Sequence, residues 1–171
     1  LLSNHEVFRS LLKSSPATLP KSPYSFLINH QADSQQIDLI ISDTCPFCKK
    51  MLRELLNLLL MTDQYSLSIK IDTKEQNIQR LTDWLFQQLQ AFQAEFNEYF
   101  NFSVIQKGEI AFKGHFSSTI LDQIPPQLLQ ASLHNPYNIK KYPTTFLDGQ
   151  LLPEVYGSDQ LKQHLILQQY S

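Results

Sequence analysis

The chain has 171 residues, which is the length of one ordinary domain with room for an insertion. Charged residues make up 18% of it and the formal net charge is −2, so it lacks the basic excess of a nucleic-acid-binding protein, and we expect no nucleic-acid partner. No apolar run approaches the roughly 20 residues that span a bilayer. With two cysteines, the sequence excludes a scaffold of several disulfides and a zinc site of four cysteines.

The first part of the chain predicts a short helix, a connector and two strands. Ser3 and Glu6 have capping-box spacing and predict the start of the helix. Three prolines within residues 15–23 predict an extended connector. Two apolar runs of strand length follow, at 25–29 and 37–42, and the second has the composition of a buried strand. Because the chain starts with Leu rather than Met, we expect a processed chain, a fragment or an excised domain.

A helix, a strand and a longer helix are predicted next. Residues 49–61 are rich in Leu and free of Gly and Pro, which predicts a helix. Residues 65–72 alternate apolar and polar side chains, which predicts a half-buried strand. Thr73 and Gln76 form a second capping box, which predicts the start of a long helix with an apolar stripe. Its aromatic residues, including Trp84, are predicted to pack in the core, with a groove for an apolar partner segment as the alternative.

The segment after this long helix carries weaker signals. Residues 103–116 contain Gly108 and Gly114, and we expect a hinge between helices there because glycines interrupt regular elements. Short helices are predicted at 118–123 and 126–133, separated by two consecutive prolines.

The C-terminal segment predicts a strand, a turn, a strand and a helix. Asp148 and Gly149 form a two-residue hairpin signal between strands at 145–147 and 150–152. Asp148 is therefore predicted to be a turn residue rather than a catalytic acid. Ser158 is predicted to cap a last helix.

Cys45 and Cys48 form a CxxC motif between the predicted buried strand and the helix that follows it. The first turn of a helix offers N–H groups with no intrahelical partner and the positive end of the helix dipole, and both stabilise a thiolate. Pro46 suits the first helical position. We expect Cys45 to be the attacking thiol and Cys48 the more buried, resolving thiol.

Two other interpretations of the cysteines remain open at this point. A zinc half-site is disfavoured because zinc needs about four ligands, and the sequence has no second CxxC and no pair of histidines at ligand spacing. The cysteines could also be structural core residues. Lys49 and Lys50 either support a thiolate at Cys45 or belong to a solvated helix face.

Two separated segments resemble thioredoxin-fold oxidoreductases. One is LIISDTCPFCKKM, with the CxxC motif, and the other is YPTTFLDG, which is similar to the family's cis-proline segment and the hairpin after it. The ending NIKKYPTTFLDGQLLPEVYGSDQLKQHL is similar to that of bacterial thioredoxin-like domains joined to vitamin K epoxide reductase-type membrane domains. The Pro46-Phe47 pair departs from the Gly-Pro of thioredoxin, and neither Asp38 nor Asp43 can be matched to thioredoxin's buried acid.

The resemblance implies an α/β, thioredoxin-like fold in which helices flank a central mixed sheet. The whole chain, residues 1–171, is expected to form one domain with a helical insertion between the second core strand and the cis-proline strand. The expected parts are an N-terminal helix and connector at 1–23, a first half with the CxxC at 24–72, the insertion at 73–135, and a last part at 136–171.

The resemblance also implies thiol–disulfide exchange, with Cys45 and Cys48 as catalytic residues. Pro143 is expected to be cis and to lie beside the disulfide, so that the backbone of the preceding residue can pair with a substrate strand. No cofactor is expected beyond the redox-active disulfide. The residues expected to bind substrate are Pro46, Phe47, Tyr142, Pro143 and Thr144.

The implied partners are protein thiols and disulfides, together with a quinone-linked membrane domain in the same parent chain. The implied location is the extracytoplasmic, periplasmic side of the membrane, to which the full-length protein would be tethered. A redox-silent thioredoxin-fold module that binds peptides, or a structural part of a larger membrane protein, is the alternative. The sequence does not set the direction of electron transfer.

Overall fold

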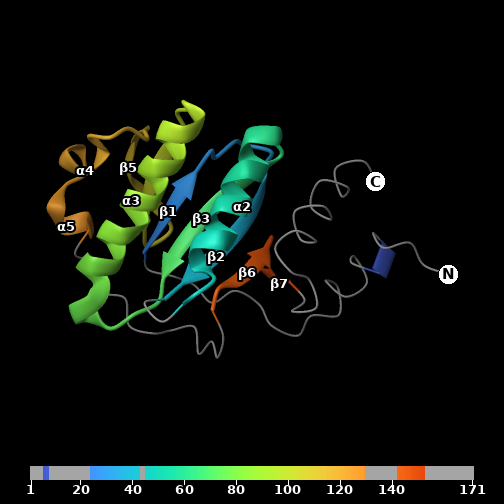
Figure 1. Cartoon of the computed structure of the whole chain (residues 1–171), viewed down its shortest axis with the longest axis horizontal. Coiled ribbons are helices and arrows are strands. Elements are labelled where there is room, and N and C mark those ends of the chain that lie inside the picture. Colours follow the sequence, from blue (N-terminus) through green and yellow to red (C-terminus); the bar gives the residue numbers. More distant parts are fainter. Residues whose placement is uncertain (1–5, 8–23, 43–44, 130–141, 153–171) are drawn as a thin grey trace.

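A seven-stranded mixed sheet with two long helices packed on one face forms the body of the protein (Figure 1). The computed structural model describes residues 6–7, 24–42, 45–129 and 142–152. The strands are β1 (Tyr24–Ile28), β2 (Gln35–Ile41), β3 (Tyr65–Ile71), β4 (Asn101–Gln106), β5 (Glu109–His115), β6 (Thr144–Leu147) and β7 (Gln150–Leu151). The helices are α2 (Cys48–Met61), the 3₁₀ turn η1 (Glu75–Asn77), α3 (Ile78–Phe96), α4 (Ile120–Gln123) and α5 (Pro126–Leu129). The predicted α/β class with a mixed sheet is confirmed.

The strand order across the sheet is β5-β4-β1-β3-β2-β6-β7. β2 and β3 are parallel, with Ile41 opposite Ile71, and every other neighbouring pair is antiparallel. A parallel pair needs a crossover connection, and α2 provides it. Because β2 and β3 end at the same edge of the sheet, the segments that lead into α2 and α3 begin at that edge.

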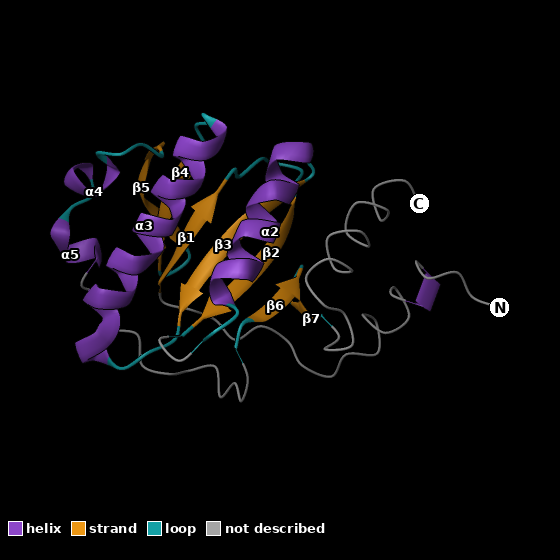
Figure 2. Ribbon diagram, viewed as in Figure 1, coloured by secondary structure: helices purple, strands orange, loops and turns teal. Residues whose placement is uncertain are grey.

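The main core lies between the sheet and the helices α2 and α3 (Figure 2). Alternate side chains of each strand face these helices, since the side-chain period of a strand is two residues. In β2 these are Ile37, Leu39 and Ile41, all of them buried. Leu52 and Leu56 of α2 lie in the same cluster and are fully buried, so the apolar stripe of this helix holds it against the sheet.

The prediction of a helical insertion is wrong for residues 101–115, which form the hairpin β4–β5. β4 pairs with β1 along its length and places Phe102 and Val104 in the core, so its alternation follows the strand period. The turn consists of Lys107 at φ 52° and Gly108 at φ 81°, the two left-handed residues that a tight hairpin turn requires. The hinge that the sequence suggested is therefore a two-residue turn.

The predicted capping box before the long helix is also wrong. Thr73 Oγ1 is buried and makes no hydrogen bond, and Lys74, not Thr73, precedes the turn η1. The 3₁₀ turn separates Thr73 from the first residue of α3, Ile78, and Asn77 rather than Thr73 is the N-cap of α3.

The other predicted elements among the described residues are present. β1, β2, β3, β6, β7, α2, α3 and the short helices α4 and α5 match the predicted segments to within a few residues. The prediction that residues 65–72 form a half-buried strand is wrong in one respect, because β3 is buried along its whole length, including its polar residues. The hairpin turn of Asp148 and Gly149 is confirmed, and both residues have positive φ. The connector, most of the first helix and the last helix were predicted within residues 1–23 and 153–171, which lie outside the described residues apart from residues 6 and 7.

Candidate functional site

Cys45 and Cys48 form a disulfide with their Cα atoms 5.4 Å apart. Helix α2 begins at Cys48, and its first turn is marked by the hydrogen bond of 3.0 Å from Met51 N–H to the carbonyl of Phe47. Cys48 is 1% exposed, whereas Cys45 is half-buried. The predicted arrangement, with Cys45 outside and Cys48 inside, is thus present in the fold.

Pro46 does not occupy the first helical position. It lies in the turn before the helix, and Cys48 is the first helical residue. Pro46 and Phe47 form the exposed tip of this turn, and Phe47 is 65% exposed. A solvent-exposed aromatic ring beside a disulfide can contact another molecule.

The first turn of α2 favours negative charge at the disulfide. It contains no acidic residue, and its two lysines, Lys49 and Lys50, are exposed. The N–H groups of a first helical turn and the helix dipole add to the positive potential of these ammonium groups. When the disulfide is reduced, these contributions favour the thiolate form of a nearby cysteine.

The Tyr142–Pro143 peptide bond is cis, as the resemblance implied. Thr144 pairs with Ile40, so Pro143 lies at the end of β2 from which the chain passes to Cys45. The Tyr142 hydroxyl donates a hydrogen bond to the Asp72 carboxylate, and the N–H of Asp72 donates to the carbonyl of Ile41 at 2.8 Å. The segment before β6 and the ends of β2 and β3 are therefore joined at one edge of the sheet.

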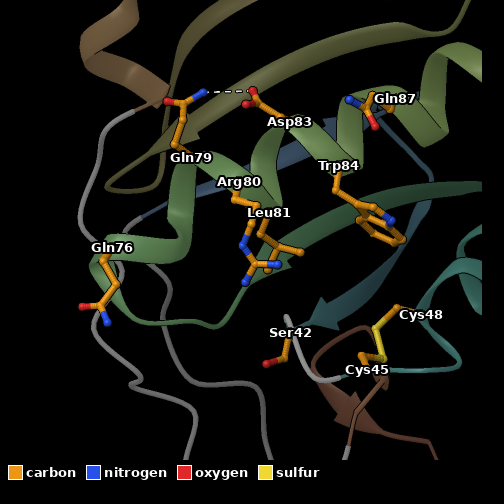
Figure 3. A pocket seen from close by; sticks show the side chains of 10 residues that line it. All are labelled: Ser42, Cys45, Cys48, Gln76, Gln79, Arg80, Leu81, Asp83, Trp84 and Gln87. Carbon is orange, nitrogen blue, oxygen red and sulfur yellow. Dashed lines mark hydrogen bonds between the residues drawn. A yellow bond between two sulfur atoms is a disulfide. The ribbon is translucent and has the colours of Figure 1, made fainter.

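A pocket of about 840 Å³ lies between the disulfide and the start of α3 (Figure 3). Its lining combines the two cysteines and Ser42 with side chains of η1 and α3. The residues that line it are Ser42, Cys45, Cys48, Gln76, Gln79, Arg80, Leu81, Asp83, Trp84 and Gln87. Of the seven residues predicted to act or bind, this lining contains the two cysteines, while Pro46, Phe47 and residues 142–144 lie outside it.

Arg80 and Trp84 are among the eight pocket residues that the sequence analysis did not assign to the site. They lie one helical turn apart on α3 and extend toward Ser42 and the disulfide (Figure 3). Trp84 is half-buried and packs against the core, which confirms its predicted packing, but its ring also faces the pocket. The i, i+4 spacing placed both residues on one helix face. No sequence signal indicated that this face lies opposite the CxxC.

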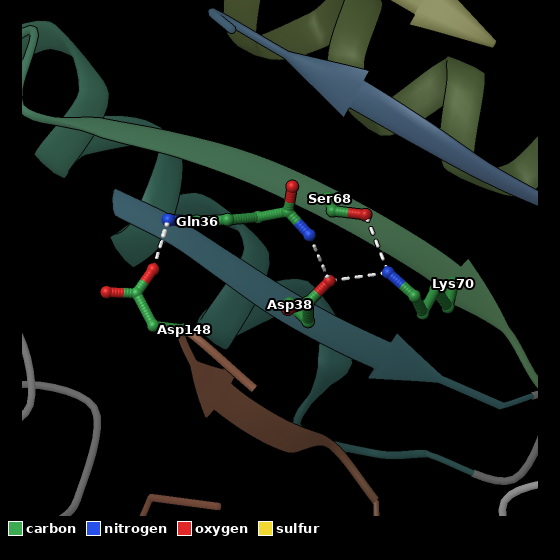
Figure 4. Close-up of polar contacts among 5 residues, drawn as sticks. All are labelled: Gln36, Asp38, Ser68, Lys70 and Asp148. Carbon is green, nitrogen blue, oxygen red and sulfur yellow. Dashed lines mark hydrogen bonds and ion pairs between the residues drawn. The ribbon is translucent and has the colours of Figure 1, made fainter. Parts of the chain in front are cut away.

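Asp38 forms a buried ion pair with Lys70 on the other face of the sheet (Figure 4). Lys70 Nζ is 2.5 Å from Asp38 Oδ1 and also donates to Ser68 Oγ at 2.7 Å. Ile37 and Leu39 on either side of Asp38 belong to the cluster that contains Cys48, so the alternation of β2 directs Asp38 away from Cys48. Asp38 therefore takes no part in this pocket.

Asp148 has the structural role that the sequence predicted. Its carboxylate accepts a hydrogen bond from Gln36 N–H (Figure 4) and another from Gln35 Nε2, each at 3.0 Å. These contacts tie the β6–β7 turn to the start of β2, at the edge of the sheet away from the disulfide.

The described residues contain no group of three His, Cys, Asp or Glu side chains that could hold a metal ion. No helix in the same part of the chain has the length and apolar character needed to cross a membrane.

Comparisons with protein-family models, with curated proteins and with solved structures find no match to this chain. Its function must therefore be inferred from the disulfide, the pocket and the residues around them.

Proposed function

We propose that this chain is a thiol–disulfide oxidoreductase that works by exchange through Cys45 and Cys48. The observation that carries the proposal is the difference in exposure within one disulfide: Cys45 is half-buried beside a pocket, whereas Cys48 is 1% exposed. An incoming thiolate therefore reaches Cys45 more readily than Cys48. Such asymmetry is what exchange through a mixed disulfide requires, because one cysteine must meet the substrate and the other must resolve the intermediate.

Three features support a thioredoxin-like fold as the basis of this activity. The sheet is mixed, the CxxC disulfide lies between a buried strand and a long helix, and a cis-proline precedes the antiparallel strand β6. They are the features that the resemblance of the two sequence segments implies.

The exchange balances in atoms and electrons. A substrate thiolate attacks Sγ of Cys45, the Cys45–Cys48 bond breaks, and Cys48 leaves as a thiolate. The second substrate thiolate then attacks the substrate sulfur of the mixed disulfide, which closes the substrate disulfide and releases the Cys45 thiolate. Two electrons pass from the substrate dithiol to the cysteine pair, and the two protons of the substrate thiols pass to the cysteine thiolates or to solvent. In the reverse direction Cys45 attacks a substrate disulfide and Cys48 resolves it.

The remaining predicted site residues are proposed to bind the substrate chain around the disulfide. An extended substrate segment would pair beside the cis-proline, at the backbone of Tyr142, whose side chain is bonded to Asp72, and at Thr144. Phe47, with its exposed ring, and Pro46 supply apolar contact on the other side of Cys45.

The setting of the reaction is proposed from the resemblance of the C-terminal segment. We propose that the domain works on the extracytoplasmic side of a membrane, tethered through a longer parent chain. Its partners would be protein thiols and disulfides and a quinone-linked membrane domain of that parent chain.

A matched pair of cysteine variants tests the activity. Oxidised protein is mixed with a reduced peptide that contains two cysteines, and the peptide disulfide and any mixed disulfide are measured by mass spectrometry. The wild-type chain should oxidise the peptide. When the substrate is the peptide disulfide and the variants are reduced, Cys48→Ser should accumulate a mixed disulfide through Cys45, and Cys45→Ser should form almost none.

Both variants lose the same disulfide, so a difference between them reports on chemistry rather than on stability. Equal amounts of mixed disulfide in the two variants would contradict the proposal. A wild-type chain that leaves the peptide dithiol unchanged would favour the redox-silent binding module.

A further inference from the structure

We propose that Asp72 is a positioning residue for peptide substrates. Its buried carboxylate holds the Tyr142 side chain and, through it, the backbone at which a substrate segment would pair near Cys45. This inference rests on the proposed thiol–disulfide exchange, since it assigns a residue to the binding step of that reaction. Asp72 belongs to neither the CxxC motif nor the cis-proline segment, and no sequence pattern pointed to it.

Asp72 is held in place by the sheet itself. It follows Ile71, the last residue of β3, and its N–H donates to the carbonyl of Ile41 at 2.8 Å, so the parallel pairing of β2 and β3 continues to Asp72. The residue is 3% exposed. Its carboxylate is therefore a fixed point at the edge of the sheet where the chain leaves β2 for Cys45.

Tyr142 lies outside the strand pairing that holds β6. β6 is paired with β2 as far as Thr144, which lies opposite Ile40, and Tyr142 precedes Thr144 by two residues. Its ring packs against the cluster of Ile40 and Phe146, and its hydroxyl donates to the Asp72 carboxylate, 70 residues earlier in the chain. The side chain thus ties the segment before β6 to the end of β3, next to the strand that leads to the disulfide.

The surroundings of this hydrogen bond suit it to holding a backbone segment. A phenol that donates to a carboxylate makes a charge-assisted hydrogen bond, which is stronger than one between neutral groups. Because Asp72 is buried, water competes little for its carboxylate, and the low local dielectric strengthens the bond. Tyr142 is held both at its hydroxyl and along its ring, so its backbone keeps one position relative to β2.

A fixed backbone matters more for a peptide than for a small thiol. Strand-like pairing needs the N–H and C=O groups of the two chains within about 3 Å of each other, so a small displacement of Tyr142 weakens it. A substrate chain that meets an ordered backbone also avoids the entropic cost of ordering it. Dithiothreitol has no peptide backbone and needs contact with Cys45 alone. The bond between Asp72 and Tyr142 therefore favours peptide substrates over small dithiols.

The ratio of two rates tests this inference. Oxidised protein is mixed with a reduced peptide that contains two cysteines or with dithiothreitol, and the second-order rate constant for the peptide is divided by that for dithiothreitol. Tyr142→Phe keeps the ring and removes the hydroxyl, whereas Asp72→Ala removes the acceptor. Each should lower the ratio about tenfold, the scale of one hydrogen bond to a charged group. The double variant should lower it no further, because the two residues act through one contact.

Two further variants separate positioning from stability. Asp72→Asn retains an acceptor oxygen for the Tyr142 hydroxyl and should keep most of the wild-type ratio. Tyr65→Phe removes a hydroxyl from the opposite end of β3, where Tyr65 is 1% exposed, and should keep the whole ratio. Tyr142→Phe carries the test by itself if Asp72→Ala does not fold.

Failure of this inference and failure of the proposed function give different results. An unchanged ratio in Tyr142→Phe, a further loss in the double variant, or an equal loss in Tyr65→Phe would overturn the positioning role and leave the exchange activity standing. A wild-type chain whose disulfide does not oxidise the peptide would instead count against the proposed function itself.

Discussion

Among single residues, Asp38 and Lys70 have a large desolvation cost, because both charged side chains are buried. Their side chains are 2% and 6% exposed, and the ammonium group is shared with Ser68 Oγ. Removing two charges from water costs several kcal/mol for each ion, and a close partner with further hydrogen bonds offsets that cost. Gln36 Nε2 donates to the same Asp38 oxygen at 2.8 Å, so this carboxylate oxygen accepts hydrogen bonds from both Lys70 and Gln36.

This buried ion pair predicts strong coupling between the two residues. Asp38→Leu or Lys70→Met alone should lower the free energy of unfolding by about 3 kcal/mol, because each leaves an unpaired buried charge. The double variant should lose less than the sum of the single losses, since it leaves neither charge behind. Urea unfolding of the four proteins measures the coupling, and additive losses would show that the pair does not act as a unit.

The two cysteines differ from Arg80 in how far the sequence could define them. The spacing of Cys45 and Cys48 after a buried strand was sufficient to predict an outer and an inner cysteine, because the helix period turns Cys48 toward the core. Arg80 could not be predicted in this way. It belongs to no motif, and its place in the pocket depends on which helix face the fold brings opposite the disulfide.

Among the elements, the hairpin β4–β5 extends the sheet beyond β1. β1 pairs with β4 across more than seventy residues of sequence, so local periodicity could not reveal that residues 101–106 would find a partner strand there. The turn carries Lys-Gly rather than the Asn-Gly or Asp-Gly that signals such a turn most strongly. These two facts explain why the segment resembled a hinge, whereas the Asp148-Gly149 turn was predictable.

A pair of glycine variants tests this hairpin. Gly108 has φ 81°, and a methyl group added there would meet open space, so Gly108→Ala should cost about 1 kcal/mol through backbone strain alone. In β5, a Cβ at Gly114 would meet the Phe112 ring at 3.5 Å, an ordinary contact, and Gly114→Ala should be neutral or stabilise by roughly 0.5 kcal/mol. Thermal unfolding measures both, and a larger loss at Gly114 than at Gly108 would contradict the hairpin.

In the molecule as a whole, the direction and order of the strands bring the residues of the pocket together. The parallel pairing of β2 and β3 ends both strands at one edge, so the CxxC before α2 and the first turns of α3 face each other there. The segment with the cis-proline reaches the same edge through the antiparallel pairing of β6 with β2. Sequence patterns predicted most of these elements, but the register and order that bring them together depend on contacts between distant residues.

The proposed function depends above all on Cys45 being the accessible, activated thiol of a redox pair. The rate of alkylation of each cysteine can be measured in the reduced wild-type protein across a range of pH, with the two sites separated by mass spectrometry. Cys45 should react much faster than Cys48, with a pKa below that of a free cysteine because of the first turn of α2 and its lysines. Equal reactivity of the two thiols, or a faster Cys48, would contradict the proposal.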